Sequence, residues 1–237
     1  MARTAIWTSI SSALTSDIAE GRYGPGDKLP TEAALATRFG VNRHTVRRAL
    51  AAMAESGLVH PRRGAGVFVT QTPTDYPIGR RVRFHQNLTA AGRTPAKTIL
   101  TLETRLADTK EADALKLTNL PTDVHVYEGL SLADDTPIAV FRSVFPAARF
   151  PGLLNDLDDT RSVTQALLRH GIADYTRAPT RLTAKMANAT QALHLRISEG
   201  APILRTVGIN IDESGTPIEF GHTWFAGERV TLTVDDL

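Results

Sequence analysis

The sequence contains no cysteine, and no run of about 18 apolar residues occurs anywhere in its 237 positions. The missing cysteine excludes disulfide bonds, thiolate metal ligands and a cysteine nucleophile, and it is typical of proteins from a reducing compartment. The missing apolar run excludes a membrane-spanning helix. Residues 1–7 also lack the charged and then apolar pattern of a secretion signal. These absences together predict a cytoplasmic protein.

Charge is distributed unevenly along the chain, although the net charge is only +2. Residues 1–70 carry nine Lys and Arg against five Asp and Glu, whereas residues 71–237 carry eighteen against twenty. A basic first third predicts that this part alone contacts a polyanion. The length suits one large or two small domains. We expect a first domain over 1–71, a linker over 72–80 and a second domain over 81–237.

Three short helices and a hairpin are predicted in the first domain. Apolar residues at helical spacing indicate a helix over 7–20. Thr31 is expected to cap a second helix, and Asn42 a third helix that stops at Gly57. Two apolar segments then flank residues 61–66, which indicates a hairpin with a basic, glycine-rich tip.

Beyond residue 81 the pattern changes to strands separated by short helices. Strands are predicted near 97–106, 123–133, 137–145, 175–186, 202–212 and 217–225. Helices are predicted at 85–91 and near 109–117, 162–170 and 188–195. Two similar turns, at 134–137 and 213–217, each join two predicted strands and suggest an internal duplication.

The third predicted helix has an apolar face and a basic face. The apolar side chains, which should pack on the first two helices, are Val46, Ala49, Leu50 and Met53. A recognition helix contacts base edges with the outward side chains of its first turns. Arginine suits this task because its N–H donors pair with guanine O6 and N7 or with phosphate. The outward basic side chains are Arg43, His44, Arg47 and Arg48, and those of the hairpin tip are Arg62 and Arg63.

A plain alternative is a solvated face with ordinary charges, because most Arg-rich helix faces are just that. Here, however, a short helix and a tight turn precede the face, and a basic hairpin follows it. This combination favours a DNA-binding winged helix-turn-helix.

The same segments resemble the GntR family of bacterial regulators. The resemblance is carried by residues 26–32, 41–50, 57–59 and 64–69. It implies a winged helix, and it places the family's DNA contacts on Arg43, Thr45, Arg47 and the wing residue Gly64. One position departs from the family pattern, since Ala33 stands where many members have an arginine.

The second domain resembles the effector-binding UTRA domain of the HutC subfamily, in residues 83–88, 92–95, 133–139 and 215–220. The resemblance implies an α+β protein, with the winged helix-turn-helix followed by a chorismate-lyase-like α/β domain with an antiparallel sheet. It also implies small-molecule binding and a homodimer on palindromic double-stranded operator DNA. Residues 41–45, 75–77 and 83–88 most resemble the phosphonate-metabolism regulators of this subfamily.

The usual anion clamp of the sugar-phosphate-sensing members is missing, because Gly129 and Ser131 stand where those members have two arginines. The anion would then be held by N–H groups at the start of the helix at 85–91 and by Arg142, although Arg142 also suits a structural ion pair. Alternatively, the ligand is zwitterionic or cationic, and its amine contacts Glu128, Glu219, Tyr127 and Trp224. The expected effector-binding residues are His85, Gln86, Asn87, Arg142, Glu219 and Thr223.

Residues and resemblance together predict a ligand-responsive transcriptional repressor of a catabolic or uptake operon, associated with the bacterial nucleoid. A phosphonate or aminophosphonate is the first candidate effector, and a less anionic amine is the alternative. We expect no enzymatic activity, cofactor or metal, because no nucleophile elbow is present and the seven histidines lack metal-ligand spacing. A chorismate-lyase-like enzyme is the distant alternative. A nonspecific DNA-packaging protein is disfavoured by the modest charge.

Overall fold

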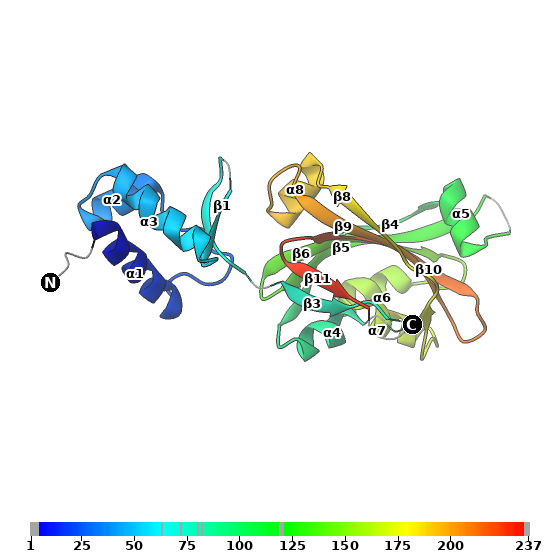
Figure 1. Cartoon of the computed structure of the whole chain (residues 1–237). Coiled ribbons are helices and arrows are strands. Elements are labelled where there is room, and N and C mark those ends of the chain that lie inside the picture. The colour runs from blue at the N-terminus through cyan, green and yellow to red at the C-terminus, as the bar shows by residue number, and fades with distance from the viewer. Residues whose placement is uncertain are drawn as a thin grey trace. The chain divides into compact units, whose positions relative to one another are not determined.

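The computed structural model describes residues 5–62, 64–71, 73–79, 81, 83–118 and 121–234. Its internal contacts divide the chain into two compact units, residues 1–72 and 73–237 (Figure 1). Within the described ranges, no helix is both long enough and apolar enough to cross a membrane.

The first unit is a three-helix bundle with a hairpin. Its elements are α1 (Ile6–Ala19), α2 (Glu32–Phe39), α3 (Arg43–Glu55), β1 (Val59–Arg62) and β2 (Gly66–Val69). Both predicted helix caps are confirmed. Thr31 Oγ1 accepts a hydrogen bond from the Ala34 N–H at 3.2 Å, and Asn42 Oδ1 accepts one from the Thr45 N–H at 2.9 Å. Gly40 ends α2 with φ 66°, a left-handed conformation that suits glycine and permits the tight turn into α3.

The predicted apolar face of α3 forms the centre of this unit. Its four side chains are at most 5% exposed. They pack with residues of α1 and α2, chiefly Ile10, Leu14 and Leu35. A single antiparallel β-bridge between Lys28 and Phe68 joins the segment before α2 to the hairpin. This arrangement is a winged helix-turn-helix.

The second unit is built on a seven-stranded antiparallel sheet. Its strands are β4 (Pro95–Leu106), β5 (Asp123–Ala133), β6 (Thr136–Pro146), β7 (Thr176–Arg177), β8 (Arg181–Met186), β9 (Pro202–Ile211) and β10 (Pro217–Ala226). They lie in the order β4-β5-β6-β10-β9-β7, with β8 also paired to β9. With the helical first unit, this sheet confirms the predicted α+β class.

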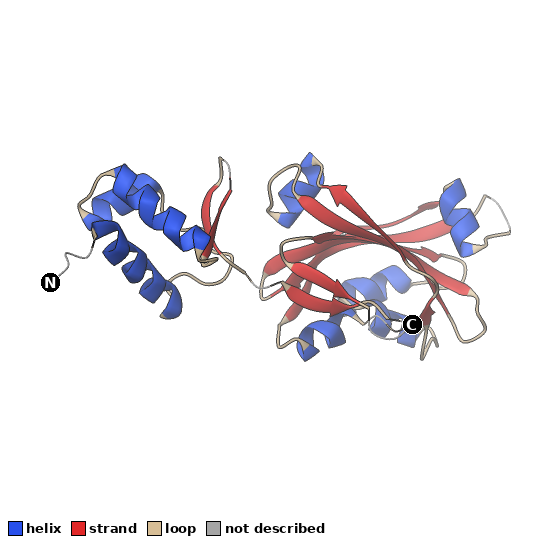
Figure 2. Ribbon diagram, viewed as in Figure 1, coloured by secondary structure: helices blue, strands red, loops and turns tan. Residues whose placement is uncertain are grey.

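Short helices cover both faces of the sheet (Figure 2). They are α4 (Phe84–Ala90), α5 (Thr109–Leu115), α6 (Leu153–Thr160), α7 (Val163–Arg169) and α8 (Ala189–Leu195). On one face, α6 and α7 bury Tyr127, Phe141 and Phe145 of the central strands. On the other face, α5 packs on Val126 and Val144, and α8 packs near Val140 and Trp224.

Three sequence expectations need correction. The expected linker contains β3 (Thr74–Pro77), which pairs in parallel with β11 (Val230–Thr233). A partner so far along the chain leaves no local signal, and neither strand was predicted. The strand expected over 175–186 is two strands, β7 and β8, which both pair with β9. Helix α6 was missed because its Asp-rich sequence follows Pro-Gly and buries only Leu153 and Leu157.

The two halves of the sheet repeat one pattern. The segments β4-α5-β5-β6 and β8-α8-β9-β10 have the same order of elements. Asp108 and Asn188 form equivalent capping boxes before α5 and α8, and Lys116 and Arg196 end these helices with φ 52°. The halves meet where β6 pairs with β10. The similarity suggested by the two turns therefore extends to whole supersecondary units.

Candidate DNA-binding face and ligand cavity

The outer face of α3 is basic and exposed. Arg43, His44, Arg47 and Arg48 are all exposed, whereas Val46, Ala49 and Leu50 between them are buried. Thr45 is half-buried, and its hydroxyl donates to Asn42 Oδ1 at 3.0 Å. The face therefore has the character of a recognition helix, with an apolar back that fixes the direction of its cationic side chains.

Three of the predicted contact residues already have partners within the unit. Arg47 donates to Glu32 Oε1 and Oε2, at 2.9 Å from Nε and 2.7 Å from Nη2. The Arg48 guanidinium lies over the Trp7 ring, 5.0 Å from its centroid, which draws Arg48 towards α1. Arg62 lies 4.3 Å over Phe68, on the hairpin.

At the hairpin tip, Gly64 has φ 74°, and a Cβ there would meet no other group within 4 Å among the described residues. The tip therefore needs glycine for its backbone conformation and leaves room for an approaching ligand. Arg63, also predicted to contact DNA, lies outside the described residues.

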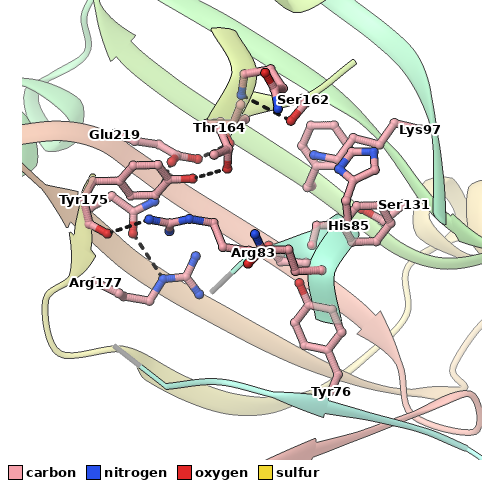
Figure 3. Close-up of a pocket in the computed structure, with 18 of the residues that line it drawn as sticks. Tyr76, Arg83, His85, Lys97, Ser131, Ser162, Thr164, Tyr175, Arg177 and Glu219 are labelled. Carbon is pink, nitrogen blue, oxygen red and sulfur yellow. Dashed lines mark hydrogen bonds between the residues drawn. The ribbon is translucent and has the colours of Figure 1, made fainter. Parts of the chain in front are cut away.

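A cavity of about 170 Å³ lies in the second unit, between the sheet face that carries Phe141 and the segments around α4, α7 and β7 (Figure 3). Its size is comparable with the roughly 150 Å³ that holds a benzene-sized molecule. Polar and aromatic side chains both line it, and most of the charged groups among its described lining residues are positive.

Lys97 is the most unusual of these charges. It extends from β4 over the Phe141 ring, with Nζ 4.2 Å from the ring centroid. Among the described residues no carboxylate lies within ion-pair distance of it. Burial lowers the pKa of Lys97 to about 8. Lys97 is half-buried, and the negative charge of Glu219 opposes this shift without cancelling it. An ammonium that is only partly compensated can accept an anionic partner.

Two arginines complete the cationic side of the cavity. Arg83 stacks on Tyr175 with its guanidinium 3.7 Å from the ring centroid, and its Nη2 donates to Tyr175 O at 2.9 Å and to Asp174 Oδ1 at 3.0 Å. Arg177 donates from Nε to Asn210 Oδ1 at 3.3 Å. In Figure 3, Arg83 and Arg177 lie beside each other below Tyr175.

Asp174 holds a second arginine as well. Arg81 donates to it from Nε and Nη2, the shorter contact being 2.6 Å. The Arg81 guanidinium, with help from Arg83, lowers the pKa of Asp174. Asp174 thus joins the start of the second unit to the wall of the cavity.

Among the described residues that line the cavity, Glu219 is the one carboxylate. It is 6% exposed, and its two oxygens accept hydrogen bonds from Ser143 Oγ and Asn210 Nδ2, each at 2.5 Å. Tyr175 lies nearby, with its hydroxyl 2.9 Å from Thr164 Oγ1. The cavity therefore has one acidic end and a larger cationic region.

The structure brings together four of the six predicted effector-binding residues: His85, Gln86, Glu219 and Thr223 line the cavity. Asn87 lies outside it and donates to Pro77 O at 3.1 Å. Arg142 is on the opposite face of the sheet, because alternate residues of β6 point to opposite sides. There it pairs with Glu111 and Glu128 at 3.1 and 3.2 Å, which is the structural ion pair considered above.

The residues proposed to contact an amine are also divided between the faces. Glu219 lines the cavity, whereas Glu128 pairs with Arg142 and Trp224 packs towards α8. Tyr127 is fully buried in the core, and burial raises the pKa of its hydroxyl. Strand alternation therefore places Glu128 and Trp224 on the face opposite Glu219, whereas Tyr127 lies on the cavity face but within the core.

Gly129 and Ser131 have different structural roles. Ser131 lines the cavity, directly opposite Lys97 in the pairing of β4 with β5. At Gly129, a Cβ would collide with Thr98 O and lie 2.8 Å from Phe141 Cζ. A side chain at position 129 is therefore sterically excluded.

Sequence reasoning missed Lys97, Arg83 and Arg177 as cavity residues. Lys97 carried a usable signal, because it is the lone charge in the apolar start of a predicted strand. Arg83 begins a segment that carries the family resemblance, but its place in the cavity, like that of Arg177, follows only from the tertiary fold.

Residues 8–69 match the model described as bacterial regulatory proteins, gntR family, and residues 90–231 match the UTRA domain. The probable transcriptional regulator PhnF of Escherichia coli is 32% identical over 97% of this chain and 94% of its own length. The HTH-type transcriptional repressor NagR of Bacillus subtilis is 27% identical over 96% and 93%. These domains and relatives are transcriptional regulators, not enzymes.

Among solved structures, PhnF from Mycobacterium smegmatis matches with a TM-score of 0.65 at 23% identity, over 96% of this chain and 99% of that one. This likeness extends over both units of the fold.

Proposed function

The chain belongs to the GntR family of bacterial regulatory proteins and carries a UTRA domain, and from this we propose how it acts as a transcriptional regulator. We propose that it represses a catabolic or uptake operon, and that a small molecule in the cavity weakens its binding to the operator. The observation that carries the DNA-binding part is the exposed basic face of α3 over a fully buried apolar back. The relative NagR, named a repressor, supports the direction of control.

We also propose a homodimer on a palindromic operator, because two-fold symmetric proteins contact half-sites about one helical turn apart. The operator contacts assigned to α3 are Arg43, His44, Thr45 and Arg47. Arg48 is assigned a phosphate contact at most, because its guanidinium already packs on Trp7. Light scattering of the purified chain tests the dimer, and a monomer at micromolar concentration would contradict it.

For the effector, we propose a small molecule with an oxyanion, such as a phosphonate. In the part of the cavity wall that the structure describes, three cations, Lys97, Arg83 and Arg177, stand against the one carboxylate of Glu219. Lys97 in particular gains a partner when an oxyanion enters. The cavity volume of about 170 Å³ is enough for a compact ligand such as a small phosphonate.

An aminophosphonate suits the cavity better than a simple phosphonate, because it carries both a negative and a positive group. The cationic region and the Glu219 carboxylate lie at different places in the cavity and can each contact one of these groups. A carboxylate oxygen accepts more than one hydrogen bond. Glu219, already oriented by Ser143 and Asn210, therefore retains capacity for an ammonium group. A purely cationic amine is disfavoured because it would meet the excess of positive charge.

DNA binding is tested by gel shift on the promoter of the protein's own operon. We expect a specific complex that a random duplex of equal length does not form at physiological salt. The double variant Arg43→Ala and Arg47→Ala should lose this complex. Retention of specific binding by the double variant would refute the assignment of α3.

The effector is tested by thermal shift with phosphonates, aminophosphonates, methylated amines and sugar phosphates. A ligand at a hundred times its dissociation constant adds about 2.7 kcal/mol of stability, which such a screen detects. We expect 2-aminoethylphosphonate or a compound of similar size to respond. A response confined to methylated amines would overturn the proposed anion.

A further inference from the structure

An acidic side chain lies in the middle of the basic face of the first unit. Glu32, the first residue of α2, receives two hydrogen bonds from the Arg47 guanidinium, from Nε at 2.9 Å and Nη2 at 2.7 Å. Both side chains remain open to solvent, with 62% of Arg47 and 33% of Glu32 exposed. Arg47, and to a lesser degree Arg43 and His44, lower the pKa of Glu32, so its carboxylate stays ionised.

This negative charge opposes general attraction to DNA. Nonspecific binding depends on how many phosphates the protein neutralises with Lys and Arg. A carboxylate that pairs with one of the arginines reduces that number. Glu32 therefore does not increase affinity for the phosphate backbone, and a different role must explain its position on this face.

The geometry of the pair leaves one edge of the guanidinium available. The carboxylate occupies Nε and one hydrogen of Nη2. Nη1 has no acceptor among the described residues, and Nη2 keeps a second hydrogen. Guanine is recognised by two parallel N–H donors that meet its O6 and N7. The Nη1–Nη2 edge supplies two such donors, while Glu32 fixes the plane in which they lie.

We infer that Glu32 is a positioning residue for base recognition, which holds Arg47 for contact with one guanine in each half-site. The inference rests on the proposed DNA-binding function and adds a specificity determinant outside the recognition helix. A free arginine rotates between base edges and phosphates, whereas a held one has its fork fixed before DNA arrives. The carboxylate also repels a phosphate at this position, which further favours the base contact.

A purely structural role predicts something different. If the Glu32–Arg47 ion pair only held α2 against α3, it would add little to the free energy of unfolding, because exposed ion pairs stabilise proteins only slightly. Loss of such a structural contact would also weaken binding to every DNA sequence alike. The positioning role instead predicts a loss of discrimination at one base pair, with little change in stability and with binding to random DNA that is equal or tighter, because a negative charge is removed and Arg47 is freed for phosphate.

The experiment begins by selecting bound duplexes from a randomised library with the full-length protein. Anisotropy titrations then measure affinity for the selected duplex, for its single-base variants and for a random duplex. The variants are Glu32→Gln, Glu32→Asp and Arg47→Ala, with Glu55→Gln as control. Glu55 also lies in the first unit, at the far end of α3, and it is exposed. Thermal unfolding of each variant checks that the fold is retained.

We expect Glu32→Gln to reduce discrimination at one G·C pair per half-site by about tenfold, the range in which one bidentate contact acts. Arg47→Ala should reduce discrimination at the same G·C base pair. A variant that combines Glu32→Gln with Arg47→Ala should lose no more discrimination there than Arg47→Ala alone. Glu32→Asp, which keeps the charge with a shorter reach, should be intermediate, and Glu55→Gln should match the parent protein.

Two results would overturn the inference. If Glu32→Gln keeps full discrimination at the pair read by Arg47, or weakens all duplexes equally, Glu32 does not position Arg47, although the DNA-binding function stands. If the parent protein enriches no sequence from the library, the proposed function fails and the inference fails with it.

Discussion

Lys97 on β4 is paired directly opposite Ser131 on β5, and both side chains line the cavity of the second unit. Ser131 stands where the sugar-phosphate-sensing members have an arginine. In this chain the cation at that level of the sheet is Lys97, from the neighbouring strand β4. Lys97 lies over the Phe141 ring, which holds its ammonium at the cavity wall.

Replacing Lys97 by methionine should abolish the response to the anionic effector and stabilise the free protein. Methionine has a similar length and removes the desolvated charge. We expect the unfolding midpoint to rise by about 2–4 °C, the shift that roughly 1 kcal/mol gives in a protein of this size. The ligand-induced thermal shift should vanish. Lys185→Met, on exposed β8, is the matched control and should leave that ligand response intact.

Effector binding should weaken above about pH 8. Burial depresses the pKa of Lys97 to about 8, so the free protein loses this charge as the pH rises through that value. An anion favours the charged form, and binding at higher pH must therefore take up a proton. Calorimetry at pH 7 and pH 9 should show affinity falling by up to about tenfold per pH unit. Lys97→Arg, which stays charged, should flatten the profile; an equally steep profile in that variant would exclude Lys97 as the titrating group.

The elements of the fold follow from local patterns much better than the cavity does. The caps Thr31 and Asn42 and the apolar face of α3 were predictable, because each rests on residues a few positions apart. The cavity joins β4 to segments more than seventy residues further along the chain, such as Tyr175 and Arg177. Strand alternation could have separated Arg142 from Ser143, but it does not reveal which face of the sheet encloses a cavity.

Asp174→Asn should uncouple ligand binding from DNA binding. Asp174 joins Arg81, at the start of the second unit, to Arg83, which lines the cavity. A ligand anion that draws Arg83 away changes this contact. We expect the variant to bind the ligand with an affinity within about threefold of that of the parent. The ratio of operator affinities without and with ligand, which is of order 5–150 in coupled systems, should fall towards one.

The control for this prediction is Asp158→Asn, which removes an exposed carboxylate paired with Arg161. Operator affinity should be measured by anisotropy with and without saturating effector. If Asp174→Asn retains the full ratio, the Asp174 contacts do not transmit occupancy of the cavity.

Gly129→Ala should destabilise the second unit, because a Cβ at this position would collide with Thr98 O and lie 2.8 Å from Phe141 Cζ. The first contact is with backbone in the paired strand, so the sheet itself must shift. We expect a loss of about 1–3 kcal/mol, the usual cost of overpacking a core. Gly221→Ala in β10 is the control, since its Cβ would meet only ordinary contacts from 3.6 Å outwards.

Urea unfolding can report on this unit alone. The chain has two tryptophans, Trp7 and Trp224, so in a Trp7→Phe background the fluorescence comes from Trp224 in the sheet. Gly129→Ala should lower the urea midpoint in this background, whereas Gly221→Ala should leave it unchanged or raise it slightly. If the two alanine variants unfold at the same midpoint, the close approach of Thr98 and Phe141 does not require glycine. An arginine clamp could then be accommodated at position 129 by a small movement of β4.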